Sequence, residues 1–529
     1  MADEMEAVPS IPTVTFAHNG VLNNQDLMGQ VFKHLDDNLE FESTRKEQLL
    51  WAGMTCRTFL NPALDVLWRS MHSIMPLLKV LPSFQLTNGS SYVLRGIKNE
   101  HWARYSYYAR RVREMVFDPE EDDEFNMIAN HTILRLAHLL PGPMLPSLRR
   151  YHAPKVDADI LFIHLLFLCP SLEHLEMENC GEFTSSAVGT LLSAIGEQQL
   201  SLKHLMLRGS LSRSTLTFIP QLTRLCSLEI MGNGQFMNVD LIEKFGTLEC
   251  LEHLVLDLEA APLVRGIPLC AEGGFQRLRN LHIIGEFSLI PDVLVHISSP
   301  FMESLTIVAP PGLLSMAFPL ACSTLMYTLS RKWLHSLRKV KVDHHGSTHY
   351  GTLSMISLHP LFLLPNIESL VVENYSLRVS QDDINKIAAA WPCLVTLKIP
   401  YNDDDFRPDL PTITCLSELA RRCPRLETLY LPINVDANPG RAVPQPVPHN
   451  LNTLGITSFS RSIEIMDVTS ILSSVHLTAR YLDCLFPCIK EVKWNHYGTR
   501  GNFWSVVGDV IRMLQETRVE ALRNPALSL

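Results

Sequence analysis

The chain has 529 residues, of which 46% are hydrophobic and 19% charged, and its 55 acidic residues outnumber its 45 basic residues to give a formal net charge of −10 at pH 7. That negative balance argues against nucleic acid or an anionic membrane as the main partner, because both favour basic surfaces. A single core rarely grows beyond about 250–300 residues, so this length favours an elongated array or several units.

The sequence predicts neither a membrane span nor an exported protein. No apolar run reaches the roughly 18 residues that a membrane span needs, and the longest candidate, Ile160 to Cys169, is interrupted by His164 and predicts a buried helix. The acidic start, Met1 to Glu6, lacks the basic and apolar regions of a signal peptide. The 12 cysteines form no C-x-x-C pair, so we expect reduced thiols and a cytoplasmic or nuclear location.

The N-terminal part predicts a tail followed by a small helical domain. Residues 1–20 are polar, with Pro9 and Pro12, and are expected to be disordered. Over residues 21–75, apolar residues recur at helical spacing on both sides of a polar connector, Asp36 to Arg45, and Pro62 is placed to open a third helix. The three helical stripes are Leu27, Met28, Val31, Phe32 and Leu35; then Leu49, Leu50, Ala52, Cys56, Phe59 and Leu60; then Leu64, Leu67 and Trp68.

Residues 76–145 predict a linker that contains a helix from His101 to Val112, a strand at Glu114 to Phe117 and an acidic loop at Asp118 to Glu124. The mixed Tyr and Arg composition of the helix suits a half-buried position. We therefore expect it to pack on the first repeat and to fix the angle between the helical domain and the array.

From residue 146 to 497 a Leu-x-x-Leu-x-Leu motif recurs, as in Leu172 to Met177 and Leu251 to Leu256. The first motif positions fall at residues 148, 172, 202, 225, 251, 278, 302, 337, 367, 394, 426, 451 and 489. Their mean interval of about 28 residues is typical of leucine-rich repeats with helices on the outer side. The predicted fold is therefore α/β, a solenoid with a curved parallel sheet and outer helices. An amphipathic helix in residues 498–529, around Trp504 and Ile511, is expected to cap the last repeat.

The helical domain resembles an F-box, the motif that docks a substrate receptor onto the Skp-family adaptor of a cullin-RING ubiquitin ligase. The matching segments are Asp26 to Leu35, Leu50 to Phe59 with its Cys56-Arg57-Thr58-Phe59, and Pro62 to Trp68, which is similar to fungal F-box proteins. The family's usual Leu-Pro start is replaced by Asn23-Asn24. The resemblance implies the following adaptor-binding residues: Leu27, Met28, Val31, Phe32, Leu35, Leu64, Leu67 and Trp68.

No catalytic motif, cofactor site or metal site is predicted. The acidic runs lie in polar segments, where nothing raises a carboxyl pKa. The segment Asp343 to His349 has no partners at metal-ligand spacing and predicts a loop. Cys484 and Cys488 predict core packing rather than zinc binding, and Gly232-Asn233-Gly234 predicts a turn.

The residues between the motif leucines are expected on the concave sheet face, because strand side chains alternate. They run from acidic and apolar (Glu176, Met206, Asp257) to basic near the C-terminus. The candidate substrate-binding residues are Lys339, Lys341, Lys398, Tyr430 and Lys493, and ordinary surface charge is an equally good explanation of them.

Together these features predict a non-enzymatic substrate-recognition subunit of a Skp-cullin-F-box ubiquitin ligase, with an unknown protein substrate and no nucleic-acid or membrane partner. The alternative is a non-catalytic leucine-rich-repeat scaffold with no ubiquitin role, in which the N-terminal helices only cap the array.

Overall fold

The computed structural model describes residues 24–37, 42–87, 91–96, 98–117, 127–128, 130–140, 142–156, 161–259, 261, 274–310, 318–344, 351–399, 410–434, 448–459, 468–494 and 501–523. The chain forms two compact units that meet in sequence at Leu222 and Thr223. The expected disordered tail and the acidic run after Phe117 lie outside the described residues. Of the loop expected at Asp343 to His349, Asp343 and His344 instead end a strand that begins at Lys339, and residues 345–349 lie outside the described residues.

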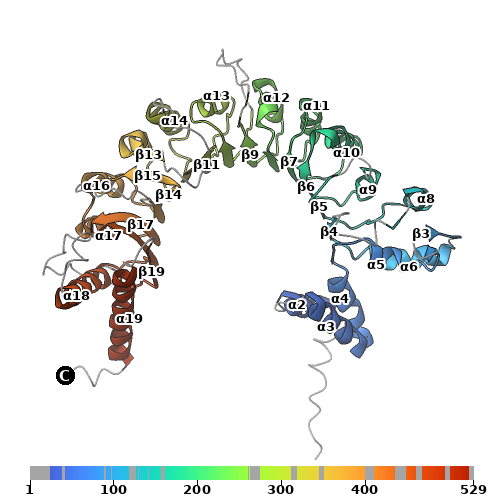
Figure 1. Ribbon diagram of the computed structural model, residues 1–529, viewed down its shortest axis with the longest axis horizontal. Helices are drawn as coiled ribbons and strands as arrows, with labels where there is room; N and C mark the ends of the chain where they lie inside the picture. The colour runs from blue at the N-terminus through green and yellow to red at the C-terminus, as the bar shows by residue number, and fades with distance from the viewer. Residues whose placement is uncertain are drawn as a thin grey trace, which may run out of the picture. The chain divides into compact units, whose positions relative to one another are not determined.

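The first unit begins with three helices, labelled in Figure 1: α2 (Gln25–Asp37), α3 (Glu42–Thr55) and α4 (Arg57–Leu67). Two of their predicted boundaries are wrong. Helix α3 already starts within the expected connector, and α4 starts five residues before Pro62. Cys56 is extended (φ −154°) and separates α3 from α4, so the helix is under way when it reaches the proline. There the ring removes one hydrogen bond, to the carbonyl of Thr58.

The rest of the first unit is a parallel sheet with helices. Its strands lie in the order β1–β4–β5–β6–β7. The sheet begins before Pro146, because β1 and β4 pair with each other and β4 pairs with β5. The elements are β1 (Ser70–Met71), α5 (Met75–Leu78), β2 (Phe84–Thr87), β3 (Ser91–Leu94), α6 (Asn99–Ala109), β4 (Glu114–Val116), α8 (Asn130–Leu139), β5 (Arg150–Ala153), α9 (Leu161–Leu166), β6 (His174–Cys180), α10 (Ser185–Glu197), β7 (His204–Gly209) and α11 (Arg213–Leu216).

In the second unit the parallel strands lie in the order β8–β9–β10–β11–β12–β14–β16–β17–β18–β19. Figure 1 shows helices covering one face of this sheet. The strands are β8 (Ser227–Met231), β9 (His253–Asp257), β10 (Asn280–Ile284), β11 (Ser304–Ala309), β12 (Lys339–His344), β14 (Ser369–Val372), β16 (Thr396–Lys398), β17 (Thr428–Asn434), β18 (Thr453–Phe459) and β19 (Glu491–Trp494), with β13 (Gly351–Ser354) and β15 (Tyr375–Arg378) forming a separate pair. The helices are α12 (Val239–Phe245), α13 (Ile290–Val295), α14 (Phe318–Lys332), α15 (Met355–Leu358), α16 (Gln381–Ala390), α17 (Leu416–Arg422), α18 (Val468–Leu485) and α19 (Gly501–Arg523).

The repeat motif sets both the start and the register of the strands. From β5 to β19, every strand of these two parallel arrays begins two residues after the first position of its motif. The second motif leucines then lie opposite one another, as in Leu254, Leu281 and Leu305, and they are buried. The α/β solenoid-like architecture expected from the sequence is thus confirmed.

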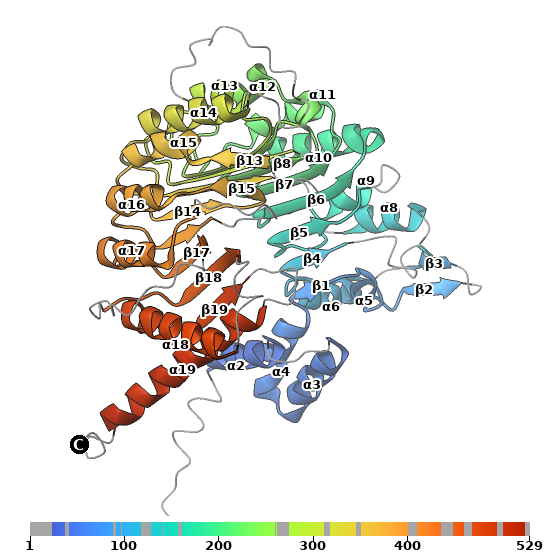
Figure 2. The ribbon, with the colours of Figure 1, turned by 60° about the vertical axis from the view of Figure 1, so that its left-hand side comes forward.

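Helix α19 covers the last strand. Figure 2 shows it running beside α18 and β19. Its Trp504, Val507 and Ile511 are buried, and the Gln515 amide donates to the carbonyls of Pro487 and Ile489. These contacts shield the edge that a repeat array exposes at its end. Cys488 lies beyond the end of α18 and is exposed, which corrects its expected place in the core, because Pro487 ends the helical run.

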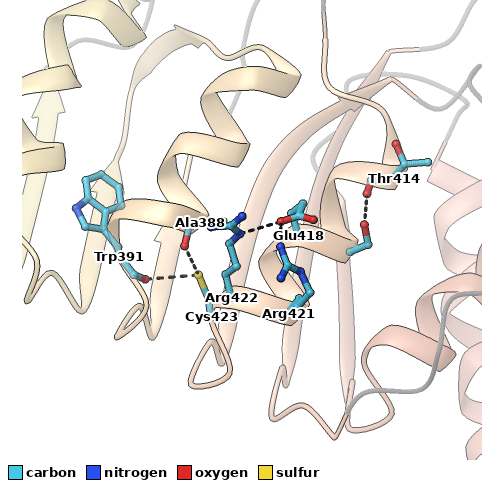
Figure 3. A network of polar contacts seen from close by, with 8 residues as sticks. Ala388, Trp391, Thr414, Glu418, Arg421, Arg422 and Cys423 are labelled. Carbon is cyan, nitrogen blue, oxygen red and sulfur yellow. Dashed lines mark hydrogen bonds and ion pairs between the residues drawn. The ribbon is translucent and has the colours of Figure 1, made fainter.

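Neighbouring repeats are also joined by side-chain donors placed just before three of the strands, and Figure 3 shows the Cys423 thiol of this series. The Cys423 thiol lies 3.5 Å from the carbonyl oxygen of Trp391, and the Trp391 indole donates across 3.2 Å to the carbonyl of Leu361. His449 continues the series toward Cys423 at 3.0 Å. Each of these bonds satisfies a buried backbone carbonyl of the preceding repeat, which would otherwise destabilise the fold.

Candidate functional site

The helices α2, α3 and α4 enclose a core of their own. Met28, Phe32, Leu49 and Ala63 are buried together, and the rings of Phe32 and Phe59 meet edge-to-face at 5.7 Å. These burials correct two of the expected adaptor contacts, because Met28 and Phe32 support the domain from inside. The side chain of Leu35 lies outside the described part of the chain.

The outer surface of these helices carries large apolar side chains. Leu27 and Val31 lie one turn apart on α2, and Trp51 and Met54 of α3 are 61% and 65% exposed. The exposed set, here called the apolar face, is Leu27, Val31, Leu50, Trp51, Met54 and Leu60. Soluble proteins seldom leave so many large apolar groups on one small unit unless a partner covers them. Sequence reasoning missed Trp51 and Met54, which it assigned to the motif without a role.

The C-terminal end of α4 is fastened to the sheet through α6 and the turn after it. The Arg111 guanidinium donates to Asp65, and at 2.8 Å to the Asn61 side chain, while it lies 4.5 Å from the ring centroid of Tyr107. The rings of Trp68 and Tyr108 are 4.8 Å apart. Leu64, Leu67 and Trp68 are half-buried, and Trp68 packs against this joint.

The expected helix in the linker is α6, and it contacts the sheet side as well. The Tyr105 hydroxyl is buried and donates to the carbonyl of Met144 across 3.0 Å, and burial raises the pKa of Tyr105 far above its ordinary value. The backbone of Arg113 and Glu114 donates to the carbonyl of Arg69. The joint is thus held by both side chains and backbone.

In the second unit, the face of the sheet away from the leucines presents one continuous row, here called the central row. Its members are paired strand by strand: Glu229, Val255, His282, Thr306, Lys341, Val371, Lys398, Tyr430, Gly455 and Lys493. In the first unit, Glu176 and Met206 are paired in the corresponding position. The predicted set of outward residues therefore lies on one face in each unit.

The expected basic strip is largely neutralised. Lys341 lies 3.2 Å from Asp343 and 2.5 Å from Glu373. Burial alone lowers the pKa of Lys341, but these two carboxylates outweigh that effect and raise it. Lys493 lies 3.1 Å from Glu491, which, together with the nearby Tyr430, raises the pKa of Lys493.

Asp257 is also not a free surface charge. It is buried, and its carboxylate accepts hydrogen bonds from the backbone of Gly232 and Glu259, both at 2.8 Å. It therefore stabilises the predicted turn at Gly232, where φ is +75°. Lys339 is exposed one row away from the central row and pairs in register with Ser369.

Within the described residues, no three His, Cys, Asp or Glu side chains are grouped in a way that would hold a metal ion. Over the same residues, no helix has the length and apolar character needed to cross a bilayer.

Comparison with known proteins adds little. No family model matches the chain, and no curated protein matches it. Among solved structures, the crystal structure of the Rad7 and Elc1 complex in yeast aligns with 77% of this chain and 98% of that chain, with 14% sequence identity and a TM-score of 0.36. A likeness this slight carries no argument about the fold or the function of this chain.

Proposed function

We propose that this chain is a non-enzymatic substrate receptor of a cullin-RING ubiquitin ligase, acting in the cytoplasm or nucleus. The helical unit, as an F-box, would bind a Skp-family adaptor, and the leucine-rich repeats would bind the target protein. The observation that carries the proposal is the apolar face on α2, α3 and α4.

The joint at Arg111 supports the same role. A receptor must hold its target at a fixed place relative to the ubiquitin donor, because productive transfer depends on proximity and orientation. The contacts of Asn61 and Asp65 with Arg111, and of Tyr105 with Met144, limit hinging between the docking helices and the first repeats.

One observation favours the alternative of a scaffold with no ubiquitin role. Asn24, at the position of the family's usual proline, accepts hydrogen bonds from the backbone of Asp26 and Leu27 at 3.1 and 3.2 Å. It is thus a helix N-cap. A cap at this place serves the stability of α2 and gives no contact of the kind that the Leu-Pro start implies.

The test is co-purification of the full chain with a Skp-family adaptor. The double substitution Trp51→Ala with Met54→Ala removes the most exposed part of the apolar face and is expected to abolish binding. The matched control is Phe183→Ala, which truncates a 94% exposed side chain in a repeat and should leave binding intact. Absence of adaptor binding by the wild-type chain would favour the scaffold.

A further inference from the structure

The ring of Tyr430 occupies an unusual position on the sheet face. Tyr430 of β17 pairs with Gly455 of β18, and a Cβ at Gly455 would lie 2.1 Å from Cδ1 of Tyr430 and 2.6 Å from its Cγ. The ring therefore lies flat across β18, over a site that only glycine leaves open. Any larger residue at this position of the central row would push the ring away.

Lys398 is held by this ring. It pairs in register with Tyr430, and its Nζ lies 5.4 Å from the ring centroid. Within the described residues it makes no ion pair, whereas Lys341 and Lys493 each contact a carboxylate. A cation–π contact orders the long side chain without neutralising its charge. Among the described residues, Lys398 is therefore a positioned cation without an ion-pair partner, unlike the other two lysines of the row.

A row of hydroxyl groups runs beside Lys398 and Tyr430. Residues two apart on a strand face the same side, so Thr396 and Thr428 lie on the face that carries Lys398 and Tyr430. The register joins four hydroxyl residues on adjacent strands: Ser369, Thr396, Thr428 and Thr453. A hydroxyl donates one hydrogen bond, and together with an ammonium group it forms a donor set suited to an oxyanion.

We propose that Lys398, supported by the Tyr430 ring and flanked by this hydroxyl row, binds an oxyanion carried by a peptide segment of a partner protein. A carboxylate and a phosphate share the chemistry that the donors recognise. An extended peptide fits because the donors spread over several strands of an open face, so that one chain can contact all of them. The choice of a protein partner rests on the proposed function; the choice of an anion rests on Lys398 and the hydroxyl groups alone.

The test uses an array of immobilised 12-residue peptides of varied sequence, made in matched triplets that differ only in one serine, phosphoserine or glutamate. The labelled full chain is expected to prefer the phosphoserine or glutamate member. The glutamate and phosphoserine arms show which oxyanion the site favours. No preference for either anionic member by the wild-type chain would overturn the proposal.

Four variants assign the preference to the site. Lys398→Gln should reduce it about tenfold, since a charge-assisted hydrogen bond is lost. Lys386→Gln, the control, should leave it unchanged, because Lys386 lies on helix α16 and pairs with Asp382 at 2.6 Å. Gly455→Ala should displace the ring and weaken binding about two- to fivefold, whereas Tyr430→Phe keeps the ring and should bind like wild type. Equal losses in Lys398→Gln and Lys386→Gln would refute the assignment to Lys398.

Adaptor binding is measured on the same proteins and separates the two proposals. All four substitutions lie outside α2, α3 and α4, so adaptor binding should not change. A chain that shows the anion preference but binds no adaptor would contradict the proposed function and leave the anion site standing. A chain that binds the adaptor but shows no anion preference would contradict the anion site and leave the proposed function standing.

Discussion

Phe32→Ala is expected to destabilise the docking helices strongly and leave the repeats unaffected. Phe32 is 3% exposed and contacts Phe59 in a small core, whose buried hydrophobic members within the described residues are Met28, Phe32, Leu49 and Ala63. Truncation of a buried Phe costs about 3–5 kcal/mol. If the three-helix unit has about 5 kcal/mol of stability, the low end for a domain, a loss of about 4 leaves about 1 kcal/mol, and roughly one molecule in six is then open. A small fall in adaptor binding in this variant would consequently report partial opening rather than a lost contact.

Hydrogen exchange read by mass spectrometry measures this effect locally. Amides of residues 25–67 should exchange about 10²- to 10⁴-fold faster in Phe32→Ala, while amides of β8 to β10 keep their protection. Leu27→Ala is the matched control on the same helix, since Leu27 is 41% exposed and surface truncations usually change stability by less than about 0.5 kcal/mol. Wild-type exchange rates in α2, α3 and α4 of Phe32→Ala would show that the core does not rest on this ring.

Three further predictions follow from local geometry. Asp65→Ala leaves the buried Arg111 guanidinium without its carboxylate partner and should let the joint hinge. Small-angle scattering should then show a broader distribution of distances between the docking helices and the repeats. An unchanged scattering profile would mean that the Asn61 and Tyr105 contacts are sufficient to hold the joint rigid. Nδ1 of the buried His449 accepts a hydrogen bond from the Leu451 backbone, so the Nε2–H of His449 donates to the Cys423 carbonyl, and burial lowers the pKa of His449 in the folded chain. As the pH falls below about 6.5, the ordinary pKa of histidine, the unfolded chain takes up a proton before the folded chain does, so the stability present above that pH should be lost as the pH falls through the lower folded-state pKa. Chemical unfolding of His449→Gln should therefore show a weaker pH dependence below about pH 6.5 than wild type. Gly209 has a φ of +125° and a site for Cβ only 2.1 Å from the Cys180 carbonyl oxygen, so Gly209→Ala should cost at least about 1–3 kcal/mol in thermal unfolding, and an unchanged melting temperature would contradict this strain.

The repeat positions could be predicted from the sequence because one periodicity determines both burial and register. A strand that buries Leu281 and Ile283 must place His282 on the other face. The short strands β1 and β4 lack the leucine motif. They are defined by their backbone pairing with each other, although a long stretch of sequence separates them. The motif therefore predicted a start of the sheet that is too late in the chain. Similarly, Pro62 suggested a helix start, although the extended Cys56 already provides one.

The charge of the sheet face could not be read from single positions. Lys341 and Lys493 were assigned to a basic strip. However, Asp343 follows Lys341 by two residues and Glu491 precedes Lys493 by two residues, so each acid shares the sheet face of its lysine. Glu373 reaches Lys341 from the next strand, which only the register reveals. Lys398 has no acidic residue two positions before or after it in the sequence, and its role depends on Gly455, whose missing side chain has no sequence signal of its own.

The cysteine thiols buried between repeats can report local unfolding of the array, because each thiol becomes accessible to alkylation only when its repeat opens. Burial raises the pKa of the Cys180, Cys322, Cys415 and Cys423 thiols to about 12, so at neutral pH these thiols do not ionise and alkylating reagents cannot reach them. Cys56 and Cys488 are exposed, so they are alkylated first and give the reference rate for an unprotected thiol. The order in which the buried thiols then become labelled distinguishes an array that frays repeat by repeat from one that opens as a whole.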